Sequence, residues 1–244
     1  MTTSVRPTTP PDTHAEVPPL SRAAQIGAGL SLVLAGLLNG GAPYAGHLLM
    51  GDLDFSEQIR WGTEHPVLHQ VEQSALLASL FFLPLGILGL AQVCRWRSPR
   101  LTATATVLAL WGMWGFHTII ALGYTAGTVA PGALGVDDAV ALNEAFLSHT
   151  GVTAVALVPH LVGSFLGMLL LAVAGWRSRV LHRVPLVLLV VFLLWDFLAS
   201  AVGPLEPHLL LMASLVWLGV QMVRLPRTAW AGAPPTTENK DDEG

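Results

Sequence analysis

Six long apolar runs constrain the fold of this chain more than any other feature of its sequence. A helix needs roughly 20 mostly apolar residues to cross about 30 Å of hydrocarbon. A membrane strand would instead show strict alternation of apolar and polar residues, which these runs lack. The sequence therefore predicts an all-α fold, a polytopic membrane bundle of six transmembrane helices. The predicted spans are residues 23–43, 74–93, 101–124, 151–175, 184–203 and 207–223.

The composition excludes a soluble enzyme. Only 11% of the 244 residues are charged, whereas a soluble domain carries about 25%. The single cysteine, Cys94, excludes an internal disulfide and a CxxC metal site. The expected partner is the lipid bilayer, with no nucleic acid, and the oligomeric state is left open.

Basic residues lie in alternate loops, which predicts the orientation of the chain. Of the 12 Lys and Arg residues, only Arg60 lies outside the two tails and the loops near 95–100 and 177–183. Bacterial membrane proteins concentrate these residues on the cytoplasmic side. We therefore expect the bacterial cytoplasmic (inner) membrane, with both termini in the cytoplasm.

The chain divides into a membrane domain and two tails. The Thr- and Pro-rich residues 1–20 predict a disordered cytoplasmic tail, and residues 225–244 predict another. Residues 21–224 form the six-helix domain. Within it, 137–148 predicts a short amphipathic helix on the outer surface.

Three ionisable side chains are expected at one depth in the membrane. His117, His160 and Asp196 lie about seven or eight residues, roughly 10–12 Å, inside the outer ends of three different spans. A carboxylate near mid-bilayer costs about 2.5–3.5 kcal/mol, so Asp196 is expected to face the bundle and to find a partner there. These three residues are the predicted catalytic site.

The neighbours of His160 indicate which way it faces. Gly163, Ser164 and Gly167 follow it on one helix face and form a stripe of small residues. Such stripes let two helix backbones approach closely. His160 is therefore expected to face a neighbouring helix, and His117 is expected to share its own helix face with Trp111 and Trp114.

A second group of polar residues opens the second span. Pro66 suits the first turn of a helix, which places His69 and Glu72 three residues apart on one face, a spacing that can clamp a cation. The predicted metal ligands are therefore His117, His160, His69 and Glu72.

Four functions remain open from the sequence, and so does enzymatic status. The first is a metal- or haem-dependent membrane enzyme acting on an apolar small molecule, since imidazole and carboxylate suit transition metals. The second is a proton-coupled transporter that uses Asp196 and the histidines. The third is metal-free acid catalysis on an isoprenoid by Asp196 or Glu72, and the fourth is a structural membrane protein.

The C-terminal third carries a recognisable order of features. A span bearing His and Gly ends in an AGWRSR turn, an apolar span follows, and the last span ends in WLGVQMVR. This pattern resembles the uncharacterised multi-pass membrane proteins of actinobacteria. The resemblance is compositional and implies no activity and no functional residue.

Overall fold

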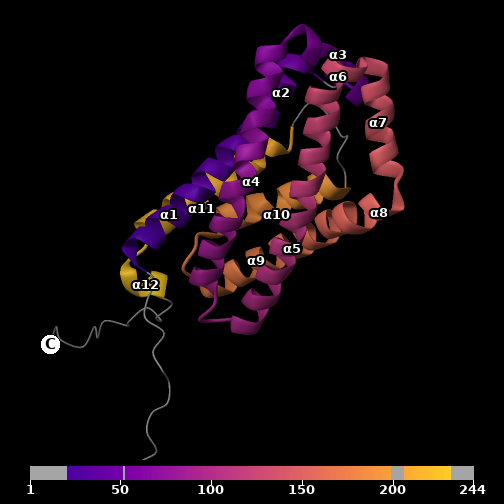
Figure 1. Ribbon diagram of the computed structural model, residues 1–244. Helices are drawn as coiled ribbons and strands as arrows, with labels where there is room; N and C mark the ends of the chain where they lie inside the picture. The colour runs from indigo at the N-terminus through magenta and orange to yellow at the C-terminus, as the bar shows by residue number, and fades with distance from the viewer. Residues whose placement is uncertain (1–20, 52, 199–205, 232–244) are drawn as a thin grey trace, which may run out of the picture.

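All regular structure in the described part of the chain is helical. The computed structural model describes residues 21–51, 53–198 and 206–231, and no strand occurs among them (Figure 1). The symbol η denotes a π-helical segment. The elements are α1 (Arg22–Ala35), η1 (Gly36–Gly41), α2 (Ala42–Met50), α3 (Phe55–Glu64), α4 (Pro66–Cys94), α5 (Pro99–Tyr124), η2 (Thr125–Val129), α6 (Ala130–Leu134), α7 (Val136–Ser148), α8 (Thr150–Val152), η3 (Thr153–Leu157), η4 (Pro159–Ser164), α9 (Phe165–Ser178), α10 (Arg183–Leu198), α11 (His208–Arg224) and α12 (Arg227–Ala231).

Each predicted apolar run forms a helix wherever it is described. Consecutive elements join into four continuous helices that are long and apolar enough to cross a membrane. The shorter α11 is also apolar, and α10 is apolar over its 16 residues. The prediction of an all-helical, membrane-compatible fold is confirmed. The four long helices span Arg22–Met50, Pro66–Cys94, Pro99–Leu134 and Thr150–Ser178.

Three π-helical segments have a common local cause. Each of η1, η2 and η3 ends two residues before a proline, namely Pro43, Pro131 or Pro159. A proline ring clashes with the carbonyl four residues earlier and removes one hydrogen bond. A wider turn at that carbonyl relieves the clash and lets the helix continue. The three carbonyls belong to Asn39, Gly127 and Val155, each inside its π-helical segment.

Small residues bring two pairs of helices into close contact. A Cβ atom on Gly219 of α11 would lie 2.5 Å from the carbonyl oxygen of Gly29 in α1. A Cβ atom on Gly163 of η4 would lie 2.6 Å from the backbone nitrogen of Gly112 in α5. The second contact is the close backbone approach that the stripe containing Gly163 predicts.

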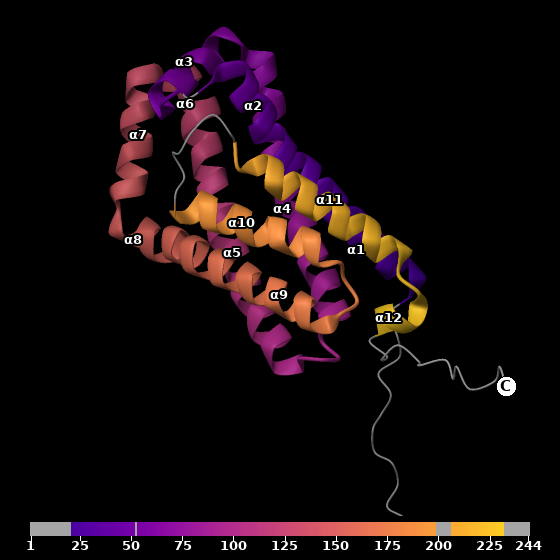
Figure 2. The same cartoon turned by 180° about the vertical axis from the view of Figure 1, so that it is seen from behind.

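One end of the bundle gathers the arginine-rich loops. The Gln25 amide donates to the carbonyls of Met222 and Leu225, at 2.8 Å each, and joins the start of α1 to the end of α11. The backbone N–H of His182 donates to the Gln221 side chain at 3.2 Å, which adds the α9–α10 loop. Both views place α12 at this end, opposite α2, α3 and α7 (Figures 1 and 2).

The C-terminal tail is ordered further than the sequence predicts. Residues 227–231 form α12, and the Trp230 side chain is only 2% exposed. The Gln92 amide donates to the Trp230 carbonyl at 3.2 Å and fixes α12 against the end of α4. The prediction of disorder from residue 225 is therefore wrong for 225–231, because one large apolar side chain suffices to dock this segment. The remaining predicted tails, 1–20 and 232–244, lie outside the described residues.

Short helices cover the opposite end. The predicted amphipathic helix at 137–148 is α7, which packs against α3 and α6. Arg60 of α3 pairs with Asp137 of α7 at 3.4 Å, an exposed ion pair that contributes little stability. Asp54 caps α3, and the backbone N–H of Glu57 with the Ser56 hydroxyl holds the pKa of Asp54 below its usual value.

Candidate functional site

A small cavity lies where all six apolar helices meet. Its volume is about 90 Å³, and most of its wall is apolar. Five side chains in the wall are polar: His160 and Ser164 from η4, Asp196 from α10, His208 from α11 and Asn39 from η1. Leu83 of α4 and Phe116 of α5 complete the contribution of the six helices. The other lining residues are Met113, Met168, Leu189, Phe192, Leu193, Phe197 and Leu211.

His160 is held between a hydroxyl group and two aromatic rings. Its Nδ1 lies 3.3 Å from the Ser164 hydroxyl, one turn further along the same helix. The Phe116 ring stacks on the imidazole at 4.9 Å between centroids, and the Phe197 ring lies at 5.5 Å. These contacts fix the ring orientation and shield its faces, which leaves the nitrogens as its reactive positions.

The carboxylate of Asp196 lies near a second histidine. His208 opens α11 and forms a hydrogen bond with the Glu206 carboxylate. Both His208 and Glu206 lie within electrostatic range of Asp196. The cavity is therefore flanked by two carboxylates and an imidazole on the side of the α10–α11 connection.

Two histidines from different elements lie near Glu206. The hydrogen bond to His208 lowers the pKa of Glu206, and the nearby His47 of α2 lowers it further, against the effect of partial burial. Glu206 therefore stays ionised at neutral pH.

Asn39 is positioned by the π-helical segment that contains it. Its amide nitrogen donates to the Ser79 hydroxyl at 2.9 Å, and both side chains are buried. The Ser79 hydroxyl in turn donates to the Leu76 carbonyl at 2.6 Å. This chain of bonds joins the first long helix to α4 beside the cavity.

Two of the three residues predicted at one depth line this cavity, and the third does not. His160 and Asp196 line it, whereas His117 is exposed on the outside of α5. Successive helix residues point about 100° apart, so a helix that turns Phe116 inward turns His117 away. The buried face of α5 carries Gly112, Met113 and Gly115, and its exposed face carries Trp111 and Trp114.

The predicted pair His69 and Glu72 does not form a clamp. The His69 ring packs against Gly62 of α3, and its Nε2 lies 3.2 Å from the Thr128 hydroxyl of η2. The Glu72 carboxylate packs instead against Gly46 of α2. Each side chain fills the space left by a glycine on a different neighbour, so the two diverge.

The described residues do not support the predicted metal site. Nowhere in 21–51, 53–198 and 206–231 do three His, Cys, Asp or Glu side chains come close enough to hold one ion. A haem does not fit the central cavity, since about 90 Å³ is far below the roughly 300–1,000 Å³ of ordinary ligand pockets. The prediction of a metal or haem site on His117, His160, His69 and Glu72 therefore gains no support from the geometry.

The sequence contains weak signals for the site residues that the prediction missed. Glu206 and His208 flank Pro207 at the start of the last span, on the outer side toward which the predicted depth of Asp196 also points. Asn39 is one of two amides in its apolar run, the other being Gln25 near the start, and Pro43 follows Asn39 four residues later. An amide at the carbonyl that a proline disrupts indicates a locally widened helix, where functional groups are often found.

Comparison with protein families, with curated proteins and with solved structures found no match. The interpretation of the site therefore rests on its own geometry and chemistry.

Proposed function

We propose that this chain is a proton-coupled integral membrane protein with an outward-facing, intramembrane proton-binding site. In this proposal all six apolar helices span a bacterial cytoplasmic membrane, and both termini lie in the cytoplasm. The arginine-rich end of the bundle supports this orientation, because positive residues favour the cytoplasmic side. The Glu206 end of the cavity then faces outward.

One observation carries the proposal. His160, Asp196 and His208 come from three different helices and line a single cavity within an apolar bundle. Ionisable groups inside a membrane protein are costly and usually mark ion or proton pathways. A structural role would be served equally well by uncharged amides such as Asn39.

The size of the cavity favours the proton over larger ligands. A water molecule occupies about 30 Å³ of liquid, so about 90 Å³ has room for only a few waters. A short water chain can pass protons between a carboxylate and an imidazole, whereas an isoprenoid or a quinone needs a larger space.

In this proposal each residue has a role that follows from its position along the proton route. Glu206 and His208 collect a proton from the outer solution, because the ionised Glu206 attracts it and His208 lies at the cavity wall. The proton passes to a carboxylate oxygen of Asp196 and returns by the same route. His160, oriented by Ser164 and the two phenyl rings, provides the second basic group on the far side of the cavity.

Infrared difference spectroscopy tests this proposal directly. We expect the reconstituted protein to gain a protonated carboxyl band when the outer solution is shifted from about pH 8 to about pH 5. The band should disappear in Asp196→Asn and persist in His117→Gln, the matched control with its histidine outside the cavity. Identical spectra for the parent protein and Asp196→Asn would contradict the proposal.

Kinetics of the same signal test the outer route. The band should form more slowly in His208→Gln, because the entry route then lacks its titratable group, while its final amplitude is retained. An unchanged rate in His208→Gln would show that protons reach Asp196 by another path.

A further inference from the structure

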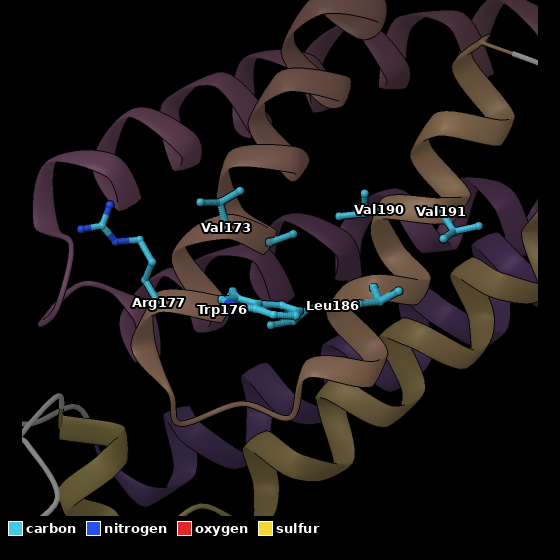
Figure 3. Close-up of a pocket in the computed structure, with 8 residues that line it drawn as sticks. Val173, Trp176, Arg177, Leu186, Val190 and Val191 are labelled. Atoms are coloured by element: carbon cyan, nitrogen blue, oxygen red, sulfur yellow. The ribbon is translucent and has the colours of Figure 1, made fainter.

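A second, larger hollow lies on the outside of the bundle between α9 and α10. Its volume is about 340 Å³, and its wall is almost entirely apolar. Val173 of α9 and Val187, Val190 and Val191 of α10 form most of it, on the side where several of these valines are exposed. Figure 3 shows the valines of the two helices on either side of the hollow. We call it the α9–α10 groove.

The end of the groove nearest the α9–α10 loop carries an indole and a guanidinium group. The Trp176 ring reaches from α9 toward Leu186 of α10 (Figure 3). The Arg183 guanidinium lies over this ring, 4.8 Å from its centroid. Arg177 also lines the groove at this end. Tryptophan and arginine together are typical of the level of lipid headgroups.

The positive charge at this end has no acidic counterpart among the described residues. Nine arginines lie there, and each of the nine described acids lies on the opposite half of the bundle. Within the described part of the chain, the ion pair formed by an arginine is that of Arg60 with Asp137, at the other end. The arginines are Arg22, Arg95, Arg97, Arg100, Arg177, Arg179, Arg183, Arg224 and Arg227.

We propose that the α9–α10 groove binds an anionic phospholipid, with one acyl chain between the valines and the headgroup phosphate on Arg183 and Arg177. Charge complementarity selects an anionic headgroup, since the described part of the chain offers no acidic partner to the cations at the groove end. Guanidinium groups bind phosphate through paired hydrogen bonds. The apolar wall selects an acyl chain, which a soluble phosphate compound lacks.

The length of the groove agrees with one leaflet. Val191 lies eight residues beyond Arg183 along α10, which corresponds to about 12 Å of helix. Half of a hydrocarbon core of about 30 Å is about 15 Å. A chain whose headgroup is held at Arg183 therefore runs along the groove through most of its leaflet.

Native mass spectrometry of the purified full-length protein tests the site. The protein is titrated with dioleoyl-phosphatidylglycerol and, separately, with dioleoyl-phosphatidylcholine. We expect the first phosphatidylglycerol to bind about fivefold more tightly than phosphatidylcholine, the ratio expected for one favourable arginine contact. Added inorganic phosphate should not displace it, because the acyl chain contributes to the binding.

Two variants and two matched controls locate the site. Arg183→Gln should weaken phosphatidylglycerol binding about fivefold. Arg97→Gln is the matched control, because Arg97 also stacks on a tryptophan at this end, 5.5 Å from the Trp96 centroid, and it should not weaken the binding. Val187→Trp should fill the groove and weaken both lipids, whereas Val184→Trp, on the same helix but outside the groove, should weaken neither.

The proposal is overturned if both lipids bind equally to the parent protein, if free phosphate displaces the lipid, or if Val187→Trp and Val184→Trp bind equally well. Circular dichroism of each variant establishes that the helices are intact. Because Arg183→Gln replaces an exposed side chain, it keeps the test decisive should Val187→Trp fail to fold.

Discussion

A side chain near the start of the first helix forms hydrogen bonds to the end of the last helix. The last carbonyls of a helix have no hydrogen-bond donor within that helix. At the end of α11, the buried Gln25 side chain of α1 donates to two of these carbonyls. The bonds bridge 197 and 200 residues of sequence. One amide therefore closes the first helix of the bundle onto the last.

Replacing this amide should destabilise the protein measurably. Gln25→Leu leaves the carbonyls of Met222 and Leu225 buried without that donor, which costs about 1–3 kcal/mol. Thermal unfolding in detergent should show a lower Tm. Gln70→Leu provides the control, because Gln70 is exposed and donates to Tyr124 at the surface, and its effect should stay within about 0.5 kcal/mol. Equal effects of the two variants would contradict this role.

Glu206 gives the stability a predictable pH dependence. Its hydrogen bond to His208 lowers its pKa in the folded protein below the ordinary value of 4.5. The unfolded chain therefore binds the proton first, and the stabilisation is complete above that value and lost as the pH falls through the lowered pKa. Melting temperatures measured from about pH 6 to about pH 3 should fall for the parent protein. Glu206→Gln should flatten this part of the curve, and a parallel curve would refute the assignment.

For whole helices, the sequence predicts that a helix forms more reliably than it predicts which face of the helix is buried. The six apolar runs all become helices in their described residues, because length and composition alone determine that outcome. In α5 the glycines indicate the buried face, because Gly112 and Gly115 lie against the neighbouring helix. The tryptophans Trp111 and Trp114 lie on the exposed face. His117 was predicted in the site from its depth in the span, but depth does not determine facing: His117 shares the exposed face of Trp111 and Trp114, and Phe116 lines the cavity instead.

The site was predicted only in part for a related reason. His160 and Asp196 are recognisable as intramembrane ionisable residues, and both line the cavity. His208 and Asn39 belong to it through the packing of α11 and η1 against helices distant in sequence. No local pattern encodes such contacts, because they arise only once the helices have assembled.

Glycine contacts between elements yield a paired prediction. Gly163→Ala should destabilise the bundle, because the added Cβ would lie 2.6 Å from the Gly112 backbone nitrogen. Gly27→Ala should instead stabilise it by about 0.5–1 kcal/mol, since nothing lies within 4 Å of the added atom on the exposed face of α1. Chemical denaturation of the two variants in the same detergent should give shifts of opposite sign. Shifts of the same sign would contradict the close contact.

Among the residues that the structure describes, the nine acids lie apart from nine of the ten arginines. The short helices α2, α3, α6 and α7 lie at one end (Figure 2), and the described acids lie in that half of the bundle. The arginine-rich loops lie at the other end. The proposed topology of six spans makes a distinct claim for each loop. In particular, the connection between α10 and α11 must reach the outer solution.

Cysteine labelling in intact cells checks that topology. In a Cys94→Ala background, Asp138→Cys and Glu206→Cys should react with a membrane-impermeant maleimide added outside. His182→Cys should react only after the cells are permeabilised. Labelling at Asp138→Cys without labelling at Glu206→Cys would indicate that α10 and α11 do not both cross the membrane.

The same charge separation gives the described part of the chain an electric dipole along its long axis, which the proposed topology places along the membrane normal. In an energised bacterial cell the cytoplasmic side is negative, and each elementary charge that crosses the full potential changes its energy by about 2.3 kcal/mol per 100 mV. With the arginine end inside, as proposed, the field acts along the dipole and holds the protein in place. Inverting the protein would move both sets of charges against the field, so the membrane potential itself opposes the wrong orientation.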